Sequence, residues 1–105
     1  MSNLASLPET ERYRFLYVGM DIHKDSHTAV ALNCFGQRIL ELKIANSTDD
    51  FDNLIEKVSQ VSKEKNLVPV FGLEDSFGYG ARLARHLFEK QMPVKMVPMK
   101  HNRQA

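Results

Sequence analysis

The spacing of hydrophobic residues changes along this chain, and that change limits the possible folds more than any other feature. Up to residue 45 the apolar residues form a continuous run or alternate with polar ones, as they do in β-strands. Beyond residue 50 they recur at intervals of three and four in two segments, and a short apolar run follows each segment. The sequence therefore predicts three consecutive strands followed by helix, strand, helix and strand.

The first three strands are expected to form an antiparallel meander. Residues 13–20 are aromatic or aliphatic with little polar interruption, which is typical of a central strand covered on both faces. This strand should end at Asp21, before a turn at residues 23–25. Residues 26–32 and 38–45 alternate, and the turn residues 33–37 separate them. Connections this short favour antiparallel pairing.

The second half of the chain contains residues that commonly begin or end helices. Ser47 has the spacing of a capping box to the acid three positions later, and Asn66 is a plausible helix end. Residues 67–73 form an apolar strand, and Pro93 stops the second helix before a last strand at 94–97. The apolar stripe of the first helix comprises Phe51, Leu54, Ile55, Val58 and Val61, and that of the second comprises Leu83, Ala84, Leu87 and Phe88.

Right-handed crossovers would place the fourth strand beside the first and the fifth strand beyond it. The predicted fold is an α/β domain with a mixed five-stranded sheet of order 3-2-1-4-5 and flanking helices, a ribonuclease H-like topology that ends early. A chain of 105 residues suits one domain. We expect residues 1–12 to be a flexible N-terminal tail and residues 13–105 to form the domain.

Composition excludes several classes of protein. A single cysteine, Cys34, cannot form an intramolecular disulfide or a cysteine-based zinc cage. The chain has no signal peptide and no apolar run long enough to cross a bilayer, so a cytoplasmic location is expected. The net charge of +1 gives no general attraction to polyanions. Nucleic-acid contacts would need local groups, for which Lys24, Tyr79, Lys100 and Arg103 are the candidates.

Two acids, Asp21 and Glu74, each follow an apolar strand. If those strands are parallel neighbours, the two carboxylates meet at one edge of the sheet, and such oxygen ligands suit Mg²⁺. An aspartate at a strand end is often only a turn residue, so either acid taken alone would be a weak candidate. His23 and His27 lie in a turn and a strand, where their spacing does not bring them to one face, and both are expected to be solvated.

A resemblance to a known family rests on four blocks that occur in the same order: GMDIHKDSHTAVAL, ANSTDDFDNLI, VFGLEDSFGYGARLARHL and PVKMVPMKHNR. Between about residues 17 and 103 the chain resembles the N-terminal DEDD domain of bacterial insertion-sequence transposases of the "one-ten" group, which includes the Piv DNA invertase. The resemblance implies a RuvC-like fold in which four acids bind Mg²⁺ for DNA cleavage and rejoining. Asp21 matches the first acid and Glu74 the second.

The resemblance also implies features beyond this site. The other two aspartates and a serine-bearing C-terminal domain of the family would follow residue 105, so the chain alone should bind Mg²⁺ weakly and catalyse little or nothing. The implied partners are DNA of the mobile element and its target, a structured guide RNA and further copies of the protein. Asp75 departs from the family, which usually has a small residue there.

Two other interpretations remain open from the sequence. One is a nucleotide-binding fragment of the actin and sugar-kinase type, although such proteins place glycine and Ser or Thr where this chain has His23, Lys24 and Asp25. The other is a non-catalytic interaction module with the same fold. Tight ATP binding would favour the first, and the absence of cation binding near the two acids would favour the second.

Overall fold

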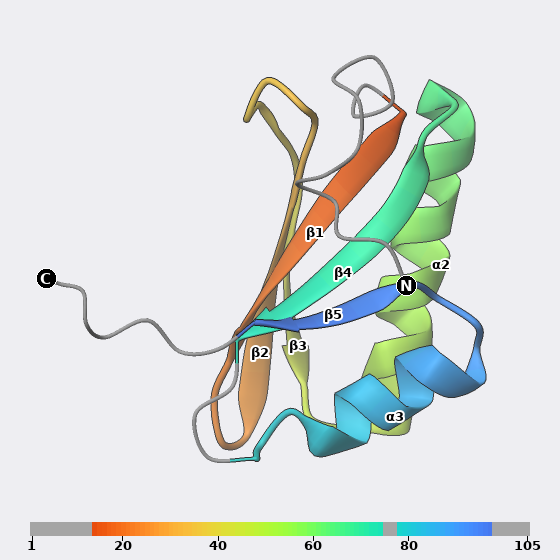
Figure 1. Cartoon of the computed structure of the whole chain (residues 1–105). Helices are drawn as coiled ribbons and strands as arrows, with labels where there is room; N and C mark the ends of the chain where they lie inside the picture. The colour runs from red at the N-terminus through yellow and green to blue at the C-terminus, as the bar shows by residue number, and fades with distance from the viewer. Residues whose placement is uncertain (1–13, 75–77, 98–105) are drawn as a thin grey trace, which may run out of the picture.

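The computed structural model describes residues 14–74 and 78–97. Within these residues the chain forms one five-stranded sheet and two helices (Figure 1). The strands are β1 (Phe15–Ile22), β2 (Ser26–Leu32), β3 (Arg38–Ala45), β4 (Val68–Glu74) and β5 (Val94–Val97), and the helices are α2 (Thr48–Lys65) and α3 (Ala81–Glu89).

The strand order is β3-β2-β1-β4-β5, which confirms the predicted topology. β1 pairs antiparallel with β2, and β2 pairs antiparallel with β3. β4 lies parallel to β1 on one side and to β5 on the other. The parallel pair at the centre of the sheet is the feature that positions the site.

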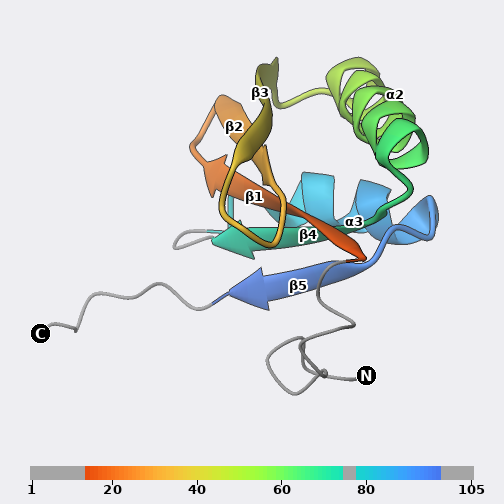
Figure 2. The same ribbon diagram turned by 90° about the horizontal axis from the view of Figure 1, so that it is seen from above.

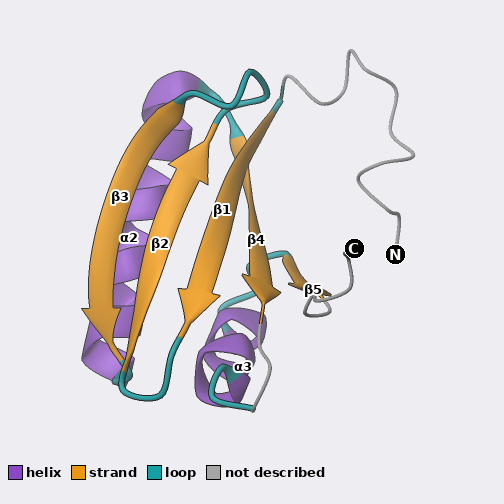
Figure 3. Cartoon of the chain, turned by 90° about the vertical axis from the view of Figure 1, so that its left-hand side faces the viewer, coloured by secondary structure: helices purple, strands orange, loops and turns teal. Residues whose placement is uncertain are grey.

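Both helices cover the same face of the sheet (Figures 2 and 3). Both crossovers, β3 to β4 and β4 to β5, advance in the same direction across the sheet, so two right-handed connections place α2 and α3 on one side. The prediction that the first strand is covered on both faces was therefore wrong. Its residues alternate, with Leu16, Val18 and Met20 buried against the helices and Gly19 exposed on the other face.

Helix α2 begins and ends where the sequence predicted. The side-chain oxygen of Ser47 accepts a hydrogen bond from the Asp50 amide at 3.3 Å, and the Asp50 carboxylate accepts one from the Ala45 amide at 2.7 Å. Asn66 ends the helix in the left-handed conformation, with φ of 58°. The hydrogen bonds at the N-terminal end of α2 also fix the connection from β3 to α2.

Helix α3 differs from its prediction at one position. Leu83 and Leu87 are buried, but Phe88 is 78% exposed, although we had assigned it to the apolar stripe. Phe88 follows Leu87 directly and so lies about 100° around the helix from it. Before α3, Gly78 adopts a φ of 80°, and its carbonyl accepts a hydrogen bond from the Ala81 amide at 3.2 Å, which closes a tight turn.

The helices of the described ranges include none with the length and apolar character required to cross a membrane.

Candidate functional site

Asp21 and Glu74 are direct neighbours in the sheet. They are register partners in the parallel pair of β1 and β4, where adjacent strands lie roughly 4.8 Å apart. The first strand is predicted to end at Asp21, but β1 extends one residue further, to Ile22, so Asp21 is its penultimate residue. Both acids are exposed and share the face that neither helix covers. We call this face the helix-free face.

A shallow hollow of about 380 Å³ lies beside the two acids. Its floor includes Gly19 and Gly72, which are also register partners and precede the acids by two residues. Thr28, the partner of Asp21 on β2, lies on its other side. A ligand that contacted both carboxylates would therefore have space over the centre of the sheet.

Asp21 has a hydrogen-bond partner in the turn that follows β1. The Nε2 atom of His23 lies 3.1 Å from Oδ2 of Asp21. Because an ionised carboxylate only accepts hydrogen bonds, His23 must carry a proton on Nε2 and donate it. Both side chains are largely exposed, so this contact orients the carboxylate more than it stabilises the fold.

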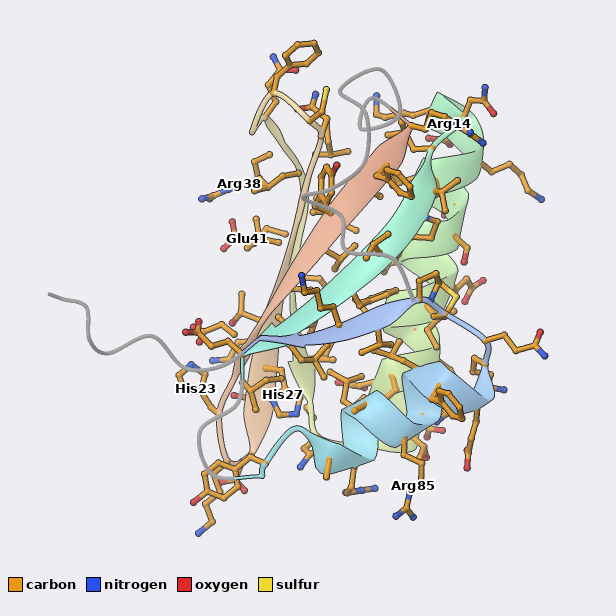
Figure 4. The ribbon with its side chains drawn as sticks, viewed as in Figure 1. Arg14, His23, His27, Arg38, Glu41 and Arg85 are labelled. Carbon is orange, nitrogen blue, oxygen red and sulfur yellow. The ribbon has the colours of Figure 1, made fainter. Side chains whose placement is uncertain are left out.

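His27 corrects a prediction. We expected it to be solvated, but it is completely buried, and Figure 4 shows it between the sheet and α3, whereas His23 lies at the strand ends. Alternation along β2 puts His27 on the covered face with Ala29 and Ala31. Its Nδ1 accepts a hydrogen bond from the backbone amide of His23 at 3.3 Å, and its ring stacks on Phe51 at a centroid distance of 6.4 Å.

The candidate nucleic-acid residues divide into two groups. Lys24 is exposed in the β1–β2 turn, and Tyr79 is 39% exposed just before α3. Figure 1 shows both segments at the end of the sheet toward which β1 and β4 run. Lys100 and Arg103 lie outside the described residues, as does Asp75.

The donor set is compatible with Mg²⁺ and incomplete. This cation is usually held by one or two carboxylates, while water and substrate phosphate fill its other positions. Asp21 and Glu74 can supply those two carboxylates. Across residues 14–74 and 78–97, His, Cys, Asp and Glu side chains nowhere form a group of three or more that could hold a metal ion. The described residues thus offer a partial site.

Comparison with known families gives one match that spans most of the chain. The family model for DEDD transposases of the IS110 group, described as "Transposase", matches residues 18–105. No curated protein sequence matches significantly.

Among solved structures, the chain is similar to T. thermophilus RuvC in complex with a Holliday junction substrate, at 12% sequence identity and a TM-score of 0.53. The match covers 80% of this chain and 65% of the RuvC chain. A weaker likeness, with a TM-score of 0.42 and 8% identity, is to an exopolyphosphatase from Cytophaga hutchinsonii and covers 79% of this chain and 34% of that one. The RuvC match shows that the sheet and helices have the RuvC-like, ribonuclease H-like fold.

Proposed function

This chain belongs to the DEDD transposase family of the IS110 group, and on that premise we propose that it forms the first part of a catalytic domain that cleaves and rejoins DNA. The observation that supports this proposal most strongly is the pairing of Asp21 with Glu74 across two parallel strands of a RuvC-like sheet. Residues 13–105 would form the partial domain, and residues 1–12 its N-terminal tail.

In this proposal Asp21 and Glu74 bind Mg²⁺. The cation would supply charge stabilisation for the attacking and leaving oxygens of a phosphodiester exchange. The chain itself holds the two carboxylates in register, because β1 and β4 are hydrogen-bonded neighbours and β4 is also paired with β5. Like charges this close repel each other, and a shared cation would relieve that repulsion.

The nucleic acid would approach along the helix-free face. The hollow beside the acids leaves room for a phosphate, and the β1–β2 turn that carries Lys24 and the segment before α3 that carries Tyr79 lie at the same end of the sheet. We propose that Lys24, Lys100 and Arg103 contact phosphates and that Tyr79 stacks on a base. Two further aspartates from outside these 105 residues would complete the metal site, and the whole protein would act as an oligomer on element and target DNA, with a structured RNA as guide.

Mn²⁺ titration of the 105-residue chain, followed by NMR, tests this proposal. Paramagnetic broadening should begin at the amides around Asp21 and Glu74, and Asp21→Asn should abolish it. Asp52→Asn is a matched control, because Asp52 is an exposed carboxylate on α2 that also lies beside a histidine. Broadening that is uniform over the surface, or unchanged in Asp21→Asn, would contradict the proposal, and tight ATP binding would favour the nucleotide-binding alternative.

A further inference from the structure

We propose that His23 is a positioning residue that orients Asp21 for cation binding, and that the buried His27 holds His23 in place from the core. This inference rests on the proposed function, because it concerns the same pair of acids. It assigns a role to two histidines that the metal site itself does not use.

The first step is the contact between His23 and Asp21. Because Nε2 of His23 donates to Oδ2 of Asp21, one carboxylate oxygen is held and the rotation of the carboxylate is restricted. The other oxygen remains available to a cation. Carboxylates that bind metals are commonly held by hydrogen bonds of this kind, and loss of such a partner typically weakens metal binding by roughly 10- to 100-fold.

The second step is the contact between His27 and the turn. The His23 amide donates to the Ser26 carbonyl at 3.1 Å and also to Nδ1 of His27 at 3.3 Å. Since Nδ1 accepts, a neutral His27 carries its proton on Nε2, and that atom is buried without a partner in the described structure. Burying a hydrogen-bond donor without a partner is unfavourable. Packing alone would favour an apolar residue here, so the bond to the turn explains the histidine better.

A third contact holds the same turn from its outer side. The Asn46 amide donates to the carbonyl of Asp25 at 3.1 Å, and the side-chain amide of Asn46 lies 3.5 Å from the carbonyl of Lys24. The carbonyl of Asn46 in turn accepts a hydrogen bond from Nη1 of Arg82 on α3 at 2.9 Å. The turn is therefore fixed at both ends, although the side chain of His23 is exposed.

The molecule contains a matched pair for comparison. His86 on α3 lies with Nε2 at 2.6 Å from Oδ1 of Asp52 on α2. This pair has the same chemistry as His23 and Asp21, but Asp52 lies on a helix and so is not paired with a second acid across two strands. A change at His86 should affect the local fold and leave the metal site unaltered.

The test compares the Mn²⁺ affinity of the wild-type 105-residue chain with that of three single variants, His23→Leu, His23→Gln and His86→Leu. His23→Leu should weaken Mn²⁺ binding by roughly 10- to 100-fold. His23→Gln should retain the wild-type affinity, because its side-chain amide can donate from a similar position. His86→Leu should also bind Mn²⁺ like the wild type. Equal affinity in all four proteins, with the wild type binding, would overturn the positioning role and leave the proposed function standing.

A second readout requires no cation. Three-bond NMR couplings report the side-chain rotamer of Asp21, which should be single in the wild type and in His23→Gln. It should be averaged in His23→Leu and partly averaged in His27→Leu. If the wild type binds no Mn²⁺, the proposed function fails, and couplings that change as expected would then show only that His23 orients the Asp21 side chain. Unchanged couplings in His23→Leu would overturn the positioning role.

Discussion

The two faces of the central strands differ sharply although they are built from alternate residues of the same segments. On the covered face, Leu16, Val18, Phe71 and Leu73 have almost no exposed surface. On the helix-free face the same two strands carry, at paired positions, two glycines and then the two acids, with Gly19 and both acids exposed. One face has the composition of a core, and the other has the composition of a binding surface.

This difference indicates how the chain separates stability from chemistry. Side chains of a strand alternate between faces, so a strand can pack a core with every second residue and present functional groups with the others. Mutations on the covered face should therefore change stability, and mutations on the helix-free face should change metal binding. Substitutions on the two faces should therefore differ in their effect on stability, which is largest for the buried aromatic residue and smallest for the exposed acid.

Phe71→Ala should produce the largest loss of stability. Phe71 is completely buried in β4, and removing a buried phenylalanine side chain typically costs about 3–5 kcal/mol. Urea denaturation would measure the loss. Phe88→Ala is the control, because Phe88 is 78% exposed and its replacement should change the free energy of unfolding by less than about 0.5 kcal/mol. Similar losses in both variants would contradict the assignment of the covered face.

His27→Leu tests a histidine that is buried on the covered face. It removes a buried unpaired N–H, whose cost is about 1–3 kcal/mol, while the His23 amide keeps its bond to the Ser26 carbonyl. We therefore expect unfolding to become about 1 kcal/mol more costly. Ser62→Ala offers a parallel case, because the Ser62 hydroxyl is also buried and has no hydrogen-bond partner among residues 14–74 and 78–97. A clear loss of stability in His27→Leu would show that stacking on Phe51 and the bond to the His23 amide outweigh the cost of the unpaired N–H.

Gly19→Ala should stabilise the protein slightly. Gly19 has an ordinary strand conformation, and an added Cβ would come no closer than 3.9 Å to the Val30 carbonyl oxygen. Glycine inside a strand costs about 0.5–1 kcal/mol relative to alanine, so thermal unfolding should shift upward. Gly36→Ala is the matched control, because Gly36 has a φ of 77°, where a side chain strains the backbone and should destabilise the protein. A loss of stability in Gly19→Ala would mean that this part of the helix-free face is closely packed.

Glu74→Gln should give the smallest gain. It removes the repulsion between two carboxylates on paired positions, for which we expect a few tenths of a kcal/mol at low salt. Because salt screens exposed charges, the gain should fade at high ionic strength. Denaturation at two salt concentrations would measure it, with Glu41→Gln as control, since Glu41 pairs with Arg38 and gains nothing by losing its charge. A gain that does not depend on salt would rule out charge repulsion as its cause.

Local patterns were sufficient to predict most of the fold. The bounds of β2 and β3 follow from alternation and turn residues, and those of β5 follow from the prolines that flank it. Ser47 and Asn66 mark the ends of α2 through their own backbone and side-chain chemistry. Coverage of the sheet was less predictable, because it depends on where the helices pack. The apolar run of β1 resembles a strand buried on both sides, but only its alternate residues meet α2 and α3.

The pairing of Asp21 with Glu74 could also be predicted, because right-handed crossovers make β1 and β4 parallel neighbours. The arrangement of His23 and His27 could not. Val30 and Leu32 are as apolar as Ala29 and Ala31, so the sequence of β2 does not indicate which of its faces is covered, and the burial of His27 depends on that choice. The contact of His23 with Asp21 depends on the shape of a three-residue turn, which spacing alone does not determine.

The most direct measurement of the central claim is a double-mutant cycle on Mn²⁺ affinity with Asp21→Asn, Glu74→Gln and both together. If the two carboxylates hold one cation, each single variant should lose most of the affinity, and the double variant should lose little more than either. Losses that simply add, or a Glu74→Gln variant that binds Mn²⁺ like the wild type, would show that the two acids do not share a site.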